Sequence, residues 1–421
     1  MVSKRILSFG FSCRALVQCA ESEGFEVTTF DRCGDADTRV FSKSFQLLSP
    51  DASYVEQVMN QNDIEQYPYI LFSGGIESDL SQFNPTLQPD RPAFLSQPWS
   101  EMRSLNNWEL WANKAGLLFP ETRPLKTDTH DETSIENSRY LIKDLKSAGG
   151  LSVAWYNHAI PHMDTRYVQQ YIEGSVFGVT FLTAPSLGMA VGCAEAWPHR
   201  QHPWGPFVFH GCIGPTSLHR EEWKCMDRFA EAVNRSTNWT GIWGADFIRS
   251  DHGIYLLEIN PRWTSSMELI AASLNVPLIQ LHCKARDSIE NEDARLDLIA
   301  ISEELRDRRK SNTKPIGKRI VYADTHREVS RDQLQAWLQE GWRSKPIENN
   351  RIQFADIPHE PTIFEPGFPI CSLFSTGECN SSLVSYLDDQ AEALLARMRD
   401  GSPSEYERID QNPRASQSEL G

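Results

Sequence analysis

An apolar stretch interrupted by acid and amide side chains sets the strongest constraint on this chain. Residues 244–262 read GADFIRSDHGIYLLEINPR, which places Asp246, Glu258 and Asn260 among β-branched, aromatic and aliphatic residues. Such neighbours favour two buried strands, and SDHG between them favours a tight turn, so the stretch predicts a β-hairpin. A carboxylate that is buried in a strand without a partner is costly. We therefore expect a cation beside this hairpin.

The oxygen donors of the hairpin are spaced to meet at one place. Glu258 and Asn260 are two residues apart on one strand and so face the same side, and Asp246 can join them from the antiparallel strand. Mg²⁺ prefers such oxygen ligands, usually one or two carboxylates together with substrate phosphates. Arg262 adds a positive charge for phosphate. The alternative is a hairpin with solvated polar residues, which each of these residues would favour if considered alone.

A lysine followed by a glycine turn predicts a phosphate contact. Lys143 ends the strand-like sequence YLIK, and the small-residue turn SAGG at residues 147–150 follows it. The backbone N–H groups of Gly149 and Gly150 can face phosphate oxygens, while Lys143 supplies a positive charge at the same place. An ordinary β-turn is the alternative, and it is favoured when these residues are considered alone.

The sequence QQYIEG at residues 169–174 has the character of a nucleobase-binding segment. An extended segment with apolar side chains can cover one face of a flat base, while its backbone groups bond the base edge and a nearby carboxylate takes ribose hydroxyls. The residues concerned are Gln169, Gln170, Tyr171, Ile172 and Glu173. The alternative is an ordinary strand that enters a turn at the following glycine.

The N-terminal sequence predicts an open α/β unit without a dinucleotide. Residues 5–31 read as strand, turn, helix and strand. Gly10 is followed by Phe11, Ser12 and Cys13, so the GxGxxG fingerprint is absent after the first strand. A Rossmann-like fold without NAD follows, and an oxidoreductase is disfavoured.

Charge and composition limit the partners. The formal charge of -16 disfavours nucleic acid, and no apolar run is long enough to span a bilayer. The N-terminus lacks an apolar core followed by a cleavage site, and the nine cysteines are odd in number and lack CxxC spacing. We therefore expect a cytoplasmic protein with reduced thiols, acting on small molecules without a nucleic acid or membrane partner.

In order and spacing, Lys143 with its glycine turn, QQYIEG, GADFI and LLEINPR resemble the ATP-grasp superfamily. The resemblance implies an ATP-dependent ligase that activates a carboxylate as an acyl phosphate, releases ADP and phosphate, and joins the acyl group to an amine or similar nucleophile. ATP and Mg²⁺ or Mn²⁺ would be the cofactors. The resemblance assigns these roles: ATP phosphates to Lys143, a lid to Gly149 and Gly150, adenine to Gln169 and the backbone of Gln170, Tyr171 and Ile172, ribose to Glu173, the metal to Asp246, Glu258 and Asn260, and the acyl-phosphate step to Arg262.

The same resemblance predicts an α/β fold and its organisation. A Rossmann-like preceding domain would span residues 1–98, a two-subdomain ATP-grasp domain 99–290, a small β-rich α+β domain 291–399, and a disordered tail 400–421. The charged sequence at the start of the third part is interpreted as a linker. GCIGP, EINPRWTSSMEL and GFPICSLFS are more narrowly similar to an ATP-grasp group found beside one-carbon and methanopterin or methanofuran cofactor genes. A homodimer is compatible with the sequence.

Where this sequence departs from the family pattern, a second interpretation stays open. Many ATP-grasp proteins have another phosphate-binding lysine at the start of a helix, whereas this chain reads SLNNWEL there. Arg103 and Lys114 lie nearby but out of register. A non-catalytic ATP-binding sensor or scaffold of the same fold is therefore the alternative.

Two other groups of polar residues leave alternatives. In the first domain, one group is either part of the substrate site or a set of helix caps and a solvated acidic turn. Its members are Ser12, Arg14, Asp31, Asp35 and Asp37. Near Cys193, three histidines suggest zinc, but proline and tryptophan interrupt their spacing, so we interpret the run as an ordinary or substrate-facing loop. Those histidines are His199, His202 and His210.

Overall fold

The computed structural model describes most of the chain. The described residues are 5–50, 53–59, 64–76, 97–125, 139–157, 165–198, 200–310, 313–343 and 351–400. The predicted disordered tail lies outside the described residues, apart from residue 400. No helix within these ranges is both long enough and apolar enough to cross a membrane.

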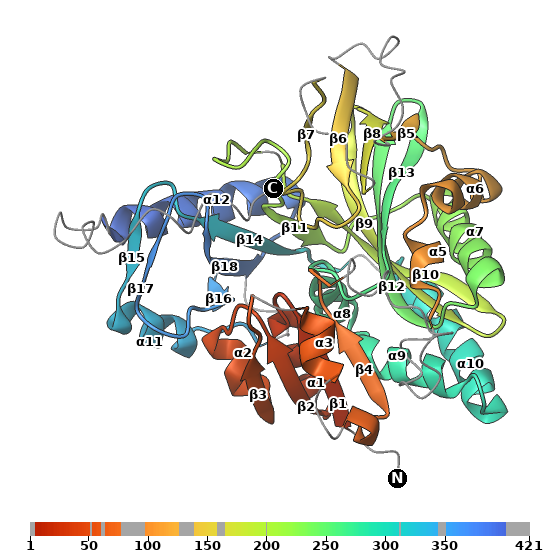
Figure 1. The fold of residues 1–421 in the computed structure, drawn as a ribbon, viewed down its shortest axis with the longest axis horizontal. Helices are drawn as coiled ribbons and strands as arrows, with labels where there is room; N and C mark the ends of the chain where they lie inside the picture. The colour runs from red at the N-terminus through yellow and green to blue at the C-terminus, as the bar shows by residue number, and fades with distance from the viewer. Residues whose placement is uncertain are drawn as a thin grey trace.

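A parallel sheet forms the N-terminal part, as the strand–helix–strand pattern predicts. Its strand order among the described residues is β3-β2-β1-β4, and it lies at the bottom of Figure 1. Strand β1 is buried along its length after Arg5, which is typical of parallel strands covered on both faces. The elements are β1 (Arg5–Gly10), α1 (Arg14–Ser22), β2 (Glu26–Asp31), α2 (Ala36–Phe41), β3 (Ser44–Leu47), α3 (Tyr54–Met59), a 3-10 turn (Ile64–Gln66) and β4 (Tyr69–Phe72).

A small antiparallel sheet follows two helices. Its order in the described part of the chain is β5-β8-β6-β7, and Figure 1 draws it at the top of the molecule. Lys143 lies on β6, opposite Tyr167 on β8. The elements are α5 (Trp99–Met102), α6 (Leu105–Ala115), β5 (Thr122–Pro124), β6 (Tyr140–Asp144), β7 (Ala154–Trp155) and β8 (Arg166–Gln170).

The largest sheet runs through the centre of the molecule. Over the described residues it has eight strands in the order β13-β12-β9-β10-β11-β14-β18-β16. The strands are β9 (Ser175–Ala184), β10 (Leu187–Ala196), β11 (Gly211–Gly214), β12 (Gly241–Ser250), β13 (Gly253–Asn260), β14 (Ile316–Tyr322), β16 (Gln353–Ala355) and β18 (Pro369–Thr376). Three of the C-terminal strands, β14, β16 and β18, thus extend this sheet. The predicted domain boundaries stay predictions.

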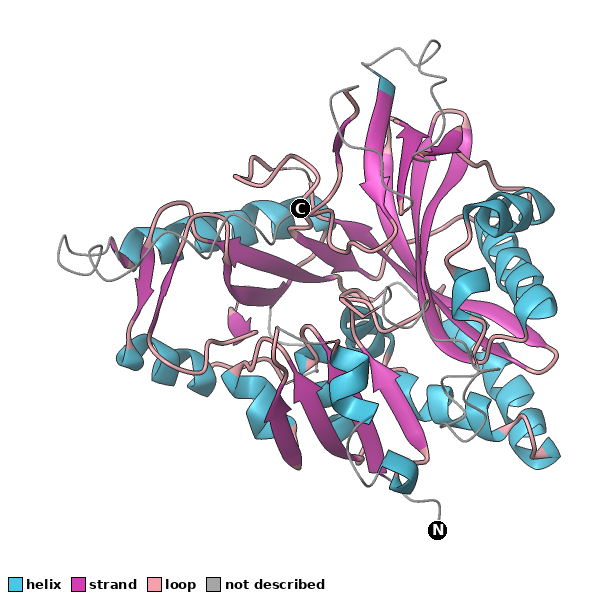
Figure 2. Ribbon diagram, viewed as in Figure 1, coloured by secondary structure: helices cyan, strands magenta, loops and turns pink. Residues whose placement is uncertain are grey.

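Helices cover both faces of the large sheet (Figure 2). On one face, α7 (Arg220–Thr237) packs on β9 and β10 through Phe229, which contacts Phe181 and Trp243. On the other face, α8 (Met267–Leu274) and α9 (Leu278–Asp287) contact strands β9 to β12 and β14. Each buried aromatic ring contributes about 1.5–3 kcal/mol by removal from water. These layers hold the hairpin β12–β13 rigidly in place.

The charged sequence predicted to be a linker is a helix, so that prediction was wrong. Helix α10 (Glu292–Arg308) begins at Asn291, whose side chain accepts a hydrogen bond from the backbone N–H of Ala294. Leu298 and Leu305 are buried one above the other, while the charges occupy the opposite, solvated face. A charge run was mistaken for a break in structure.

The remaining C-terminal elements lie at the left of Figure 1. A three-stranded sheet of described residues has the order β17-β15-β19, and α12 packs across β14 and β18. The elements are β15 (Arg327–Val329), α11 (Arg331–Gln339), β17 (Thr362–Phe364), α12 (Asn380–Arg397) and β19 (Arg399–Asp400).

Candidate functional site

A cavity of about 490 Å³ is lined by residues of the small and the large sheets. Its lining includes seven of the residues selected from the sequence: Lys143, Gly149, Gly150, Asp246, Glu258, Asn260 and Arg262. These residues come from β6, the loop after it, and the hairpin β12–β13. The fold therefore brings the predicted phosphate and metal residues around one space.

The hairpin has the predicted geometry. Asp246 on β12 pairs with Glu258 on β13, and Gly244 pairs with Asn260. A register shift after Asp246 marks a bulge, which re-aims the side chains beyond it. The Nδ2 atom of Asn260 donates to Asp246 at 2.9 Å and to Glu258 at 3.3 Å. The three side chains thus converge on one side of the sheet.

Two carboxylates lie together here with too little positive charge between them. Burial and the nearby Glu258 raise the pKa of Asp246 to about 8, although Arg262 and Asn260 act in the opposite direction. Asp246 therefore stays largely protonated near neutral pH when no cation is bound. A divalent cation would allow both groups to ionise, and the donor set of two carboxylates and one amide oxygen fits Mg²⁺. The Asn260 side chain would turn its oxygen toward such an ion, since amide orientation follows the local hydrogen bonds.

Lys143 faces the same carboxylates from the small sheet. Its Nζ donates to Oε1 of Gln169 at 2.7 Å. Burial lowers the pKa of Lys143, while the charges of Glu258 and Asp246 act to raise it. The lysine is therefore a half-buried cation held near two acids, at a position where it can contact a phosphate.

The loop after β6 depends on Gly150. Its φ of 76° is left-handed, and a Cβ atom there would lie 1.9 Å from the carbonyl oxygen of Phe207. Gly149 also has a positive φ, of 66°, but a Cβ would meet nothing within 4 Å. The backbone N–H of Phe209 donates to the carbonyl of Gly149 at 3.0 Å. The glycine loop thus packs against the segment between β10 and β11.

The segment expected to bind adenine flanks the cavity. Among the described lining residues are Tyr167 and Gly174, on either side of it, but none from 169–173. The side-chain amide of Gln169 donates to Thr122 and its oxygen accepts from Lys143. The backbone N–H groups of Gln170 and Tyr171 donate to carbonyls of Glu121 and Arg139. The base-binding roles of Gln169, Gln170, Tyr171, Ile172 and Glu173 therefore stay predictions.

Arg262 lies where the hairpin meets the N-terminal sheet. Its guanidinium donates to Oδ1 of Asn260 at 3.3 Å and to the carbonyl of Trp263 at 3.1 Å. A Cβ atom on Gly74, in the loop after β4, would lie 3.1 Å from the guanidinium carbon. The backbone N–H of Trp263 donates to the carbonyl of Phe72 at 3.1 Å. The N-terminal part thus contacts the cavity through Arg262.

Sequence reasoning missed the hydroxyl residues that follow Arg262. Thr264, Ser265 and Ser266 line the cavity beside it. Ser266 precedes the first residue of α8, so the segment also lies at a helix N-terminus, which favours negative charge. The run TSS directly after EINPRW was the available signal. His210 and Cys212 line the far end of the same cavity.

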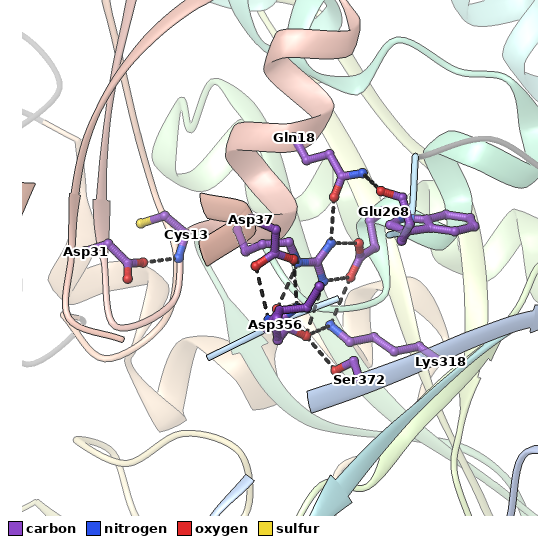
Figure 3. Close-up of polar contacts among 11 residues, drawn as sticks. Cys13, Gln18, Asp31, Asp37, Glu268, Lys318, Asp356 and Ser372 are labelled. Atoms are coloured by element: carbon purple, nitrogen blue, oxygen red, sulfur yellow. Dashed lines mark hydrogen bonds and ion pairs between the residues drawn. The ribbon is translucent and has the colours of Figure 1, made fainter. Parts of the chain in front are cut away.

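Most members of the first-domain polar group are buried, and a role of the group in the substrate site stays a prediction. Arg14 is fully buried and bonds Glu268 and Asp356, and Asp37 is buried and accepts backbone N–H bonds from Asp356 and Ile357. In Figure 3, Asp37, Glu268 and Lys318 surround Asp356. The residue at the N-cap of α1 is Cys13, and its side chain makes no capping hydrogen bond to the described residues. The expectation that Ser12 caps this helix was wrong.

Asp31 is buried as well, and Asp35 is half-buried. Asp31 accepts backbone N–H bonds from Cys13 and Gly34, both at 2.5 Å. Burial raises the pKa of Asp31 to about 6 and raises that of Asp35 well above its usual range, and the charge of Asp37 adds to the effect at Asp35. The alternative of a solvated acidic turn was wrong, because residues 356 and 357 of the C-terminal part contact this turn.

Two basic residues lie near the position of the missing family lysine, and whether either replaces it stays untested. Arg103 is buried and donates to the carbonyls of Ile259 at 2.7 Å and Leu145 at 2.6 Å, whereas Lys114 is exposed on α6. Arg103 therefore ties the end of β13 to the loop after β6.

The histidine run forms no cluster of metal ligands among the described residues. His199 lies outside the described residues. Cys193 is buried and its thiol donates to the carbonyl of Thr216, while His202 and His210 have ring centroids 5.6 Å apart. His210 lines the cavity, and a substrate-facing role for this loop stays a prediction.

Comparison with known proteins agrees with this geometry. The ATP-grasp domain family matches residues 110–266. The formate-dependent phosphoribosylglycinamide formyltransferase of Chlorobium phaeobacteroides is 30% identical over 121 residues, which cover 28% of this chain and 29% of that protein. The match thus spans less than a third of that relative.

Solved structures share the overall fold. A carboxyaminoimidazole ribonucleotide synthase from Aspergillus clavatus, in complex with ATP, has a TM-score of 0.63 and 12% identity, covering 94% of this chain and 99% of that chain. An L-amino acid ligase from Bacillus licheniformis has a TM-score of 0.61 and 13% identity, covering 94% and 97%. The biotin carboxylase domain of Hydrogenobacter thermophilus 2-oxoglutarate carboxylase, with MgADP and bicarbonate, has a TM-score of 0.63 and 10% identity, covering 94% and 90%.

Proposed function

We propose that this protein is an ATP-dependent ligase that joins a small-molecule carboxylate to an amine or a similar nucleophile, because residues 110–266 match the ATP-grasp domain family. One observation carries the proposal. Asp246 and Glu258 lie side by side in a cavity that also holds Lys143 and Arg262. The two carboxylates can bind a metal ion, and this ion together with the two basic side chains can bind phosphate.

The residues divide into three binding roles. Asp246, Glu258 and Asn260 would hold Mg²⁺ or Mn²⁺, which would neutralise phosphate charge. Lys143 and the loop at Gly149 and Gly150 would contact the ATP phosphates. The segment 169–173 would hold the adenosine.

The chemistry needs positioning and charge more than proton transfer. A substrate carboxylate oxygen attacks the γ-phosphorus of ATP, the bond from that phosphorus to the β–γ bridging oxygen breaks, and ADP leaves. The amine then attacks the acyl carbon, the bond from this carbon to the phosphate oxygen breaks, and phosphate leaves as the amine loses a proton to solvent. Arg262 would stabilise the negative charge that develops at the acyl end.

The substrates would be small carboxylates and amines, with one-carbon cofactor biosynthesis as the proposed context. Because one relative is formate-dependent, a one-carbon carboxylate should be among the first substrates tested. The cytoplasm and a homodimer remain our expectations for location and assembly.

One observation favours a second candidate, a non-catalytic ATP sensor or scaffold of the same fold. Near the position of the usual early lysine, Arg103 donates to two backbone carbonyls and Lys114 faces solvent. The protein would then bind ATP through its phosphates without transferring a phosphoryl group.

ADP release decides between the two candidates. Purified protein with Mg-ATP should be supplied with formate, bicarbonate and the proteinogenic amino acids, singly and in pairs with amines. ADP and phosphate that form only with one pair support the ligase. AMP and pyrophosphate as products exclude the acyl-phosphate route, and a melting temperature raised by Mg-ATP without turnover for any pair favours the sensor.

A further inference from the structure

A second charged cluster lies on the same side of the large sheet as the cavity. Antiparallel partners share a face, and Ala196 pairs with Cys212, which pairs with Lys318. Cys212 lines the cavity. Lys318 is buried one strand further along, and so the cluster around it adjoins the floor of the cavity.

The cluster uses every donor of a buried arginine. Arg14 is fully buried, and its guanidinium makes two parallel bonds to Glu268, at 2.5 and 2.9 Å. It also donates to Asp356 at 2.8 and 3.3 Å and to Gln18 at 3.2 Å. Lys318 donates to Glu268 at 2.9 Å and lies 3.4 Å from Asp356.

These residues belong to three separate parts of the fold. Arg14 begins α1 of the N-terminal sheet, Glu268 lies in the first turn of α8, and Lys318 lies on β14. Asp356 directly follows β16 and accepts a hydrogen bond from Ser372 on β18. Figure 3 shows Glu268, Lys318, Asp356 and Ser372 converging from these elements. The cluster therefore joins the N-terminal sheet, α8 and the C-terminal strands at one point.

Stability alone does not account for such a cluster. Burying ions costs several kcal/mol for each ion, and apolar replacements of similar volume are often as stable or more stable. Paired ions of fixed geometry instead specify a single arrangement of the elements that carry them. The planar fork of Arg14 bonds Glu268 through both oxygens, so it fixes both the position and the rotation of that carboxylate.

The element fixed in this way carries part of the cavity wall. Glu268 is two residues beyond Ser266, and Thr264, Ser265 and Ser266 all line the cavity next to Arg262. Holding the first turn of α8 thus holds these hydroxyl groups. The nucleotide residues Lys143, Asp246 and Glu258 lie on other elements.

We propose that Arg14 and Glu268 are positioning residues, which hold the Thr264–Ser266 segment in place for the non-nucleotide substrate. The role of the segment as a substrate contact rests on the proposed function, whereas its fixation by the cluster does not. Loss of the cluster should therefore loosen residues 264–271 and weaken the use of the carboxylate or amine, with little effect on ATP.

Arg14→Met is the test, and Arg309→Met is its matched control. Arg309 is also buried and makes two bonds to one carboxylate, that of Asp227, both at 2.7 Å, but it packs against α7 on the opposite face of the sheet. Both variants should lower the melting temperature. Glu268→Gln is measured in parallel, so that the question is decided even if Arg14→Met does not fold.

Hydrogen–deuterium exchange in the presence of Mg-ADP gives the first readout. Arg14→Met or Glu268→Gln should speed exchange of the amides of residues 264–271 by about tenfold, which corresponds to about 1.4 kcal/mol, and Arg309→Met should not. Exchange of this segment that changes no more than in Arg309→Met overturns the proposal.

Steady-state kinetics give the second readout. With the pair that supports ADP release, the KM for the carboxylate or amine should rise by about tenfold while the KM for Mg-ATP changes by less than about twofold. A parallel rise in both KM values overturns the positioning role. If the wild-type protein releases ADP with no pair, the proposed ligase function fails, and the exchange experiment still decides whether the cluster fixes the segment.

Discussion

Two groups of charged side chains lie on one face of the large sheet and differ in how their charges are balanced. At the hairpin, Asp246 and Glu258 are half-buried and open to the cavity, and they share a single amide donor. In the second group, burial raises the pKa of Asp356, but Arg14 and Lys318 outweigh this and the pKa falls well below its usual range. An unbalanced group is suited to receive a charged ligand, whereas a balanced one is suited to hold protein segments together.

The largest contrast is expected from removing charge at the unbalanced group. Glu258→Gln keeps the shape of the side chain and removes one of two repelling carboxylates. The melting temperature without ligand should stay the same or rise, whereas ADP release should fall about 1,000-fold or more because the metal loses a ligand. The check is the melting temperature with and without Mg-ATP, together with ADP release. A variant that keeps the full ligand-induced rise and wild-type turnover shows that Glu258 is not a metal ligand.

Removing charge at the balanced group should lower the free energy of unfolding, in contrast to the change at the unbalanced group. Glu268→Ala leaves Arg14 and Lys318 buried with only part of their counter-charge, so unfolding should become easier by about 3–5 kcal/mol. Urea denaturation of the wild-type and variant proteins measures this difference. The comparison between the two groups breaks if Glu268→Ala and Glu258→Gln change the unfolding free energy in the same direction.

Substitutions in the glycine loop test whether nucleotide binding depends on the contact between Gly150 and Phe207. Gly150→Ala places a Cβ against Phe207 at a left-handed position, whereas Gly149→Ala meets only the backbone strain. We expect the strain alone to cost about 1 kcal/mol at either position, and Gly150→Ala to raise the KM for Mg-ATP by a further tenfold or so because the loop must move. Equal effects of the two substitutions on the KM would exclude a role for the Phe207 contact.

The smallest effect concerns a carboxylate balanced by backbone groups. Glu23 accepts the N–H groups of Ile279 and Gln280 at the start of α9, and burial raises its pKa to about 7. A raised pKa in an acid means that its contribution to stability is present below about pH 4.5 and is lost as the pH rises through 7. Glu23→Gln should remove this dependence. Backbone hydrogen bonds at the helix N-terminus offset part of the burial penalty, and the stability that remains is lost between the two pKa values.

Melting temperatures of the wild-type protein and Glu23→Gln between pH 4.5 and pH 8 measure this effect. The wild-type protein should lose stability relative to the variant as the pH rises. Parallel curves for the two proteins would show that Glu23 titrates in the folded protein as it does in the unfolded chain.

The unbalanced group could be predicted from the sequence because all its members lie close together along the chain. Asp246, Glu258 and Asn260 belong to one hairpin, so strand alternation and a turn are enough to place their oxygens on one face. The parallel N-terminal sheet was predictable for the same reason, since its strands and helices alternate in sequence.

The balanced group could not be predicted, because its members meet only through tertiary packing. Arg14 lies 254 residues from Glu268 and 342 from Asp356 along the chain. Each of these residues is of a charged type that usually lies at the surface, and no neighbouring residue in the sequence indicates that it is buried. The helix α10 was missed for a related reason, since its two buried leucines are sparse beside its many charges.

The continuity of the large sheet limits how this protein can be divided or recombined. Strand β11 lies between β10 and β14, and its residues Gly211 to Gly214 pair with Ile316 to Arg319. A chain shortened at residue 290 would leave the outer edge of β11 unpaired, and open edges recruit other chains. Exchange of modules with other proteins would therefore have to carry residues 313–376 together with residues 110–266, which match the ATP-grasp domain family. The C-terminal region would thus be inherited as one unit with those residues.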